Sequence, residues 1–172
     1  LSLEGRSTAI GQPGGFDAFG AALVNGTAAH GEDFDDTFEG GPVHAGAVIV
    51  PAVLAVAERD KLPGEDALRG IAVGCEIMCR GALVAPKRFH KAGFHPTAVL
   101  GTMGAAAAAA VSMQLNEKQF VDALGIAGTQ AAGLMAAQYG AMVKRMHAGR
   151  SWQSGLYGAL LAGGGFTGIV NV

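Results

Sequence analysis

The sequence predicts an all-α fold of about six helices within one domain that covers residues 1–172. No stretch shows the period-two alternation of a half-buried strand. Half of the 172 residues are hydrophobic but only 6% are aromatic, and 28 are glycine. A chain rich in small residues favours helices that pack with their backbones close together. Its length is sufficient for one domain with a substantial core.

Each expected helix has a recognisable start or stop signal. Glu65 and Asp66 favour the positive end of a helix dipole, Pro96 suits a first helical turn, and Asn116 suits an N-cap. Pro51 predicts a kink or a late start in the second helix. Residues 86–94 are expected to be irregular, and residues 133–143 are ambiguous. The expected helices cover approximately residues 16–29, 44–59, 65–84, 96–113, 116–132 and 149–161.

Composition argues against several functional classes. A net charge of −2 does not suit a dedicated nucleic-acid binder. The uncharged runs 96–116 and 151–172 are built on Ala and Gly, contain polar residues and lack a clear aromatic belt, so we expect buried helices rather than membrane spans. Cys75 and Cys79 are four residues apart and are interpreted as small buried hydrophobes. With no signal peptide and no disulfide framework, a cytoplasmic location is expected.

An acidic segment, residues 32–39, allows three interpretations. Asp35, Asp36 and Glu39 fit the Asp-Asp-x-x-Asp/Glu pattern that holds magnesium in all-α prenyl-diphosphate enzymes. That chemistry needs a second acidic cluster and an aromatic-lined pocket, and the remaining sequence offers neither, so we expect no metal. Alternatively, one carboxylate orients a neighbouring histidine while the others cap the loop. The third interpretation is a solvated acidic loop.

Two histidines occupy matching positions at helix starts. His44 follows Pro42-Val43, and His95 precedes Pro96. A histidine at such a position can donate to a substrate carboxylate while the helix N-terminus adds partial positive charge. The structural alternative is a hydrogen bond to a backbone carbonyl. The same arrangement occurring twice favours a functional role.

Cationic residues also gather in two places. The run Lys87–Lys91 is interpreted as a solvated loop. The cluster Lys144–Arg150 lies between two uncharged stretches, where exposure is less expected. A site that gathers such groups suits a substrate with two or three carboxylates.

Taken together, these segments resemble the MmgE/PrpD family, which includes 2-methylcitrate dehydratase, cis-aconitate decarboxylase and iminodisuccinate epimerase. The resemblance covers nearly the whole chain in order. The segments that carry it are Asn25-Gly-Thr-Ala-Ala-His-Gly-Glu-Asp-Phe-Asp-Asp-Thr37, His44-Ala-Gly-Ala47, Gly93-Phe-His-Pro-Thr97 and Lys144-Arg-Met-His-Ala-Gly-Arg150.

The resemblance implies a homodimer whose subunit has a large helical domain and a smaller α/β domain. The present chain is expected to be part of the helical domain, in a longer protein. The resemblance also implies chemistry without a metal, an iron–sulfur cluster or another cofactor. In the decarboxylase branch, the matching catalytic positions are Asp33, His44, His95 and Lys144.

The same match gives candidate substrate-binding residues. His147 matches the histidine of the last motif, and Arg145 and Arg150 complete its cationic group. Three features depart from the decarboxylase pattern. The loop from Asp33 to His44 is about one residue longer, the two arginines are not expected there, and Gly93–Thr97 is closer to the MmgE and epimerase branch.

The function implied is that of a cofactor-independent lyase or isomerase. It would remove a proton next to a carboxylate of a small di- or tricarboxylic acid, with one histidine held in its tautomer by Asp33. Two alternatives stay open: a non-catalytic helical scaffold or dimerisation fragment, and the magnesium-dependent prenyl-diphosphate enzyme. Dehydration, decarboxylation and epimerisation are not distinguished by the residues.

Overall fold

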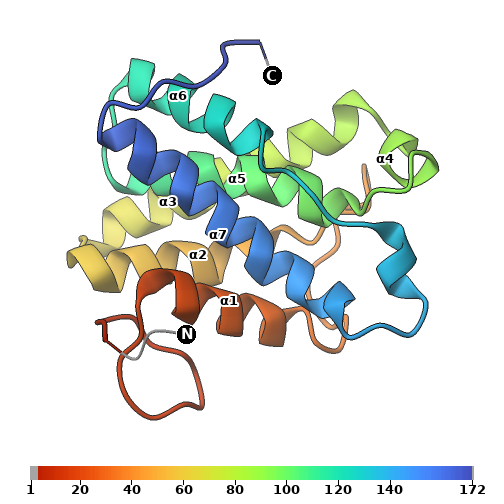
Figure 1. Cartoon of the computed structure of the whole chain (residues 1–172), viewed down its shortest axis with the longest axis horizontal. Coiled ribbons are helices and arrows are strands. Elements are labelled where there is room, and N and C mark those ends of the chain that lie inside the picture. The colour runs from red at the N-terminus through yellow and green to blue at the C-terminus, as the bar shows by residue number, and fades with distance from the viewer. Residues whose placement is uncertain (1–3, 172) are drawn as a thin grey trace.

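A computed structural model describes residues 4–171 and confirms the all-helical fold (Figure 1). Within these residues there is no β-sheet; extended pairing is limited to isolated bridges at Ser7–Phe16 and Phe94–Leu134. The helices are α1 (Ala18–Ala29), α2 (Ala45–Asp60), α3 (Gly64–Val84), α4 (Arg88–Lys91), α5 (Pro96–Ser112), α6 (Glu117–Gly128), the 3₁₀ helix η1 (Met135–Gln138) and α7 (Val143–Gly163).

Helix α5 lies at the centre of the fold. It packs against α2, α3, α6 and α7. Its alanine run, residues 105–110, is fully buried. Side chains this small let neighbouring helices approach closely, which explains how a chain with few aromatic residues closes a dense core. Figure 1 shows α7 passing across the layer formed by α2, α3 and α5.

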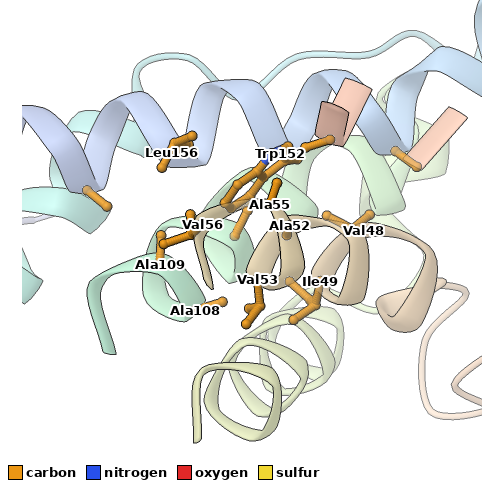
Figure 2. Packing of buried hydrophobic residues seen from close by; sticks show 14 of the residues in the cluster. Val48, Ile49, Ala52, Val53, Ala55, Val56, Ala108, Ala109, Trp152 and Leu156 are labelled. Atoms are coloured by element: carbon orange, nitrogen blue, oxygen red, sulfur yellow. The ribbon is translucent and has the colours of Figure 1, made fainter. Parts of the chain in front are cut away.

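The contact between α7 and α2 is filled by larger side chains. Trp152 and Leu156 of α7 are fully buried. Figure 2 shows Trp152 directed from α7 toward Ala52 and Ala55 of α2. One bulky ring opposite small residues fills the space between the helices and fixes their separation.

Helices α1 and α7 meet through glycine. A Cβ added to Gly149 would lie 2.3 Å from the carbonyl oxygen of Leu23, and one added to Gly26 would lie 2.8 Å from the Cα of Gly149. The expected start of the last helix at Gly149 is therefore wrong. The helix begins at Val143 and continues through Gly149, which permits close packing instead of ending or starting a helix.

At the other helix ends, some local sequence signals predicted the structure correctly and others did not. As predicted, Pro96 lies in the first turn of α5 and Asn116 is the N-cap of α6. Asn116 also forms a capping box with Gln119. Helix α2 starts at Ala45 despite Pro51, so the late start is not observed. The segment expected to be irregular contains the short helix α4. Among the residues that the structure describes, no helix has both the length and the apolar character needed to cross a bilayer.

Candidate active site

Three helix N-termini and one helix C-terminus converge at one end of the fold. His44 is the N-cap of α2, His95 is the N-cap of α5, and Lys144 lies in the first turn of α7. His30 is the C-cap of α1. The side-chain hydroxyl of Thr97 accepts the backbone N–H of His44 at 3.3 Å, which ties the first two helix starts together. Helix N-termini carry partial positive charge, so this end of the fold suits an anion.

The sequence-predicted residues Asp33 and Lys144 are in direct contact. Lys144 Nζ donates to both carboxylate oxygens of Asp33, at 2.8 and 2.9 Å. Arg145 Nη1 donates to the same carboxylate at 2.5 Å and to the carbonyl oxygen of His30 at 3.3 Å. These donors hold the pKa of Asp33 well below its usual range, with the Lys144 bond as the largest cause. Two cations around one carboxylate leave a formal charge of about +1 for a bound anion.

Four imidazole rings form a continuous cluster next to this group. The ring centroids of His30 lie 4.8 Å from His44 and 5.8 Å from His95, and His95 lies 5.1 Å from His147. The Nδ1 atoms of His95 and His147 are 3.1 Å apart and buried, so one of them donates to the other. Burial is the main reason that the pKa of His95 falls to about 3 and that those of His30 and His147 are lowered. His30, His95 and His147 are therefore neutral near pH 7.

Gly133 and Met135, just before and at the start of η1, form backbone hydrogen bonds with the chain around His95. The backbone N–H of His95 donates to the carbonyl of Gly133 at 2.9 Å, and the N–H of Met135 donates to the carbonyl of Gly93 at 2.9 Å. This pairing covers His95 and buries it. Gly133 and Met135, which belong to the stretch whose conformation was ambiguous from sequence, thus contact the residues before α5.

The carboxylate that orients histidines is Asp35 rather than Asp33. Asp35 Oδ2 lies 2.7 Å from His30 Nδ1 and 3.5 Å from His44 Nδ1. Asp33 Oδ1 is 3.8 Å from His30 Nδ1, and its hydrogen bonds go to the two cations. The predicted role for Asp33 as the partner of a histidine is thus corrected to a partner of Lys144 and Arg145. Asp33 has a left-handed backbone conformation, with φ 53°.

The acidic segment also supplies a helix cap. Both carboxylate oxygens of Asp36 accept the backbone N–H of Gly46, at 2.9 and 3.1 Å, at the start of α2. Glu39 is exposed. His30, Asp35 and His44 each offer one possible metal-ligand atom, and these atoms lie within 4.8 Å of one another. Within this group, Asp35 forms a hydrogen bond with His30.

A cavity of roughly 200 Å³ lies beside His147. Arg150 is exposed at this cavity and donates to Gln153 at 3.3 Å. The two predicted arginines have different surroundings, because Arg145 bonds Asp33 whereas Arg150 lies at this cavity together with His147. Polar residues that line the cavity include Thr102, Gln130, Ser151 and Ser154.

Sequence reasoning located the helix-starting histidines but missed His30 and Asp35 as a pair. The available signal was weak. His30 ends a predicted helix and lies directly before the acidic segment, five residues ahead of Asp35. Their contact depends on the loop path, which hydrophobic periodicity does not report.

Comparison with known proteins identifies the family of this chain. The sequence profile of the MmgE/PrpD N-terminal domain matches residues 1–172, and the chain belongs to the MmgE/PrpD family. It is 36% identical over 98% of its length to the cis-aconitate decarboxylase-like protein oryM of Aspergillus oryzae, covering 37% of that protein. It is 37% identical to the cis-aconitate decarboxylase of Aspergillus terreus, over 88% of this chain and 32% of the relative. The human cis-aconitate decarboxylase is 38% identical over 83% of this chain and 30% of the relative.

The chain therefore spans about a third of the length of these curated relatives. The family assignment, together with the protein partners of Asp35 and Asp36, sets aside the prenyl-diphosphate interpretation of the acidic segment.

Proposed function

We propose that the full-length protein containing this helical domain is a cofactor-independent lyase or isomerase acting on a small di- or tricarboxylic acid. The observation that carries the proposal is the Asp33–Lys144–Arg145 group placed beside four histidines at three helix N-termini. The names of the relatives support cis-aconitate decarboxylation as the first reaction to test.

The electrostatics suit a polycarboxylate. The two positive charges of Lys144 and Arg145 exceed the single negative charge of Asp33. The helix N-termini add to the positive potential. At the cavity that His147 and Arg150 both line, Arg150 can meet a second carboxylate of the substrate. Binding at two separated cationic positions would orient the carbon skeleton between them, next to the histidines.

The proposed chemistry is proton transfer beside a carboxylate. Removing an α-proton creates an enediolate, whose developing charge a preorganised Lys144 stabilises. His44 and His95 are the groups proposed to take or return the proton. In a decarboxylation, the bond to the departing CO₂ breaks, its electron pair is delocalised into the remaining unsaturated acid, and a protonated group delivers a proton to carbon.

The direct experiment is a substrate screen with the full-length protein. Citrate, 2-methylcitrate, cis-aconitate and iminodisuccinate are incubated separately, and products are followed by NMR with CO₂ release measured in parallel. The proposal predicts turnover of at least one acid, with cis-aconitate as the first candidate. Absence of turnover for all four, with a folded protein that binds none of them, would favour a scaffold role.

The domain organisation and assembly belong to the same proposal. We infer that this helical domain works as part of a longer subunit with an α/β domain, and that the subunit forms a homodimer in the cytoplasm. Light scattering of the full-length protein tests the assembly, and a monomer that turns over substrate would contradict the dimer.

A further inference from the structure

His30 and Asp35 form an enclosed pair with no part in the chemistry proposed above. The side chain of His30 is fully buried and that of Asp35 is 6% exposed. Their Nδ1 and Oδ2 atoms lie 2.7 Å apart. A side chain with no exposed surface does not touch a substrate from the open side of the site, so any contribution of His30 must pass through its neighbours.

The neighbour that reaches the open site is His44. Its side chain is 17% exposed, and its Nδ1 lies 3.5 Å from the same Asp35 oxygen that bonds His30. Thr37 Oγ1 also lies 3.5 Å from His44 Nδ1. Contacts of this length often tighten when substrate binds. A carboxylate that accepts from Nδ1–H holds an imidazole in one orientation and leaves its lone pair on Nε2, where it can act as a base.

Asp35 needs His30 to stay in this position. Its Oδ1 atom is buried and has no hydrogen-bond partner, so the short bond from His30 is its strong contact. A buried carboxylate that loses its donor is destabilised and tends to turn toward water. If it turned, His44 would lose the acceptor that selects its tautomer.

We propose that His30 is a positioning residue, which anchors Asp35 so that Asp35 fixes the tautomer and orientation of His44. This inference rests on the proposed function in one respect, namely that His44 acts on the substrate. The arrangement differs from a simple His–Asp pair because the carboxylate is itself held by a second, buried imidazole. The ionisable groups facing His30 are Asp33, Asp35, His44 and His95, with Lys144 further away.

Two substitutions of His30 in the full-length protein separate positioning from packing. In His30→Asn, the side-chain amide can donate from near the Nδ1 position and keep the bond to Asp35. In His30→Leu, similar volume remains without a donor. We expect His30→Leu to lower kcat by about 100-fold with little change in KM, which is the scale of a general-base contribution. We expect His30→Asn to recover most of that loss.

The pH profile gives a readout that packing alone would not move. A nearby carboxylate favours a protonated imidazole. With Asp35 released in His30→Leu, the acidic limb of kcat/KM should shift to lower pH, and in His30→Asn it should stay near its wild-type position. Equal losses in both variants, with lowered melting temperatures and an unchanged profile, would show that His30 only fills space and would overturn the proposal.

The tautomer of His44 is measured independently of turnover from its imidazole ¹⁵N chemical shifts. The proposal predicts Nδ1–H in the wild type and in His30→Asn, and a mixture or Nε2–H in His30→Leu. A mixed tautomer in the wild type, or the same tautomer in all three proteins, overturns it. If no acid is turned over but these shifts behave as predicted, the proposed function fails while the positioning role stands.

Discussion

Asp33 and Lys144 are 111 positions apart in the sequence, and Lys144 Nζ lies 2.8 and 2.9 Å from the two carboxylate oxygens of Asp33. The contact joins the loop after α1 to the first turn of α7, at the end of the fold where the two meet (Figure 1). It holds a lysine ammonium beside the histidine cluster. The catalytic proposal depends on this placement.

The close approach of α1 and α7 should be sensitive to a single methyl group. Gly149→Ala places a Cβ against the backbone carbonyl of Leu23, which has no flexible end that can move aside. We expect a loss of about 1–3 kcal/mol in the free energy of unfolding, as is usual for overpacking. Gly64→Ala is a matched control, because a Cβ there meets nothing within 4 Å. Equal denaturant midpoints for the two variants would contradict the packing account.

Acid should destabilise the fold through its buried histidines. The pKa of His95 is about 3 in the folded protein, against an ordinary value of 6.5. Between these values the unfolded chain binds more protons, so stability is complete above about pH 6.5 and decreases as the pH falls toward 3. The lowered pKa values of His30 and His147 act in the same direction.

Melting temperatures between pH 8 and pH 4 measure this effect. A constant melting temperature across the range would show that the histidines are not held neutral. His95→Gln, which removes one of the titrating groups, should make the decline with pH shallower even if the variant is less stable at every pH.

Turnover by the full-length protein should survive chelation. Asp36 caps α2 through Gly46, and Asp35 bonds His30, so both carboxylates have partners within the protein. We expect unchanged kcat after dialysis against EDTA. Asp36→Ala should cost about 0.5–2 kcal/mol of stability, as for other helix caps, with kcat nearly unchanged. Activity that is lost on chelation and restored by magnesium would return the acidic segment to the metal interpretation.

The sequence was informative where chemistry follows from local signals. His44 and His95 were identified because each stands at a helix start marked by proline or glycine, and the structure makes both of them N-caps. The central position of the alanine run 105–110 agrees with a composition rich in small residues. These features depend on neighbouring residues, which a sequence displays directly.

Other features depend on the path of the chain in space. Gly149 was interpreted as the start of a helix, whereas it lies inside α7 and faces the backbone of α1. The loop brings Asp35, rather than Asp33, within hydrogen-bond distance of His30, while Asp33 bonds Lys144 and Arg145. In an irregular segment, the directions of side chains two positions apart do not follow a regular period. The sequence could therefore place a carboxylate near the histidines, but it could not identify which one.

The most direct test of the account is Lys144→Ala in the full-length protein, with kcat and melting temperature measured together. Lys91→Ala serves as the control, because Lys91 is exposed on α4. Loss of one preorganised charge typically costs about 3–4 kcal/mol in the transition state, or roughly 100- to 1000-fold in rate. We predict a decrease in kcat of this size for Lys144→Ala. Its melting temperature should stay close to those of the wild type and of Lys91→Ala. Near-normal kcat with a lowered melting temperature would contradict the catalytic role and make Lys144 a structural partner of Asp33.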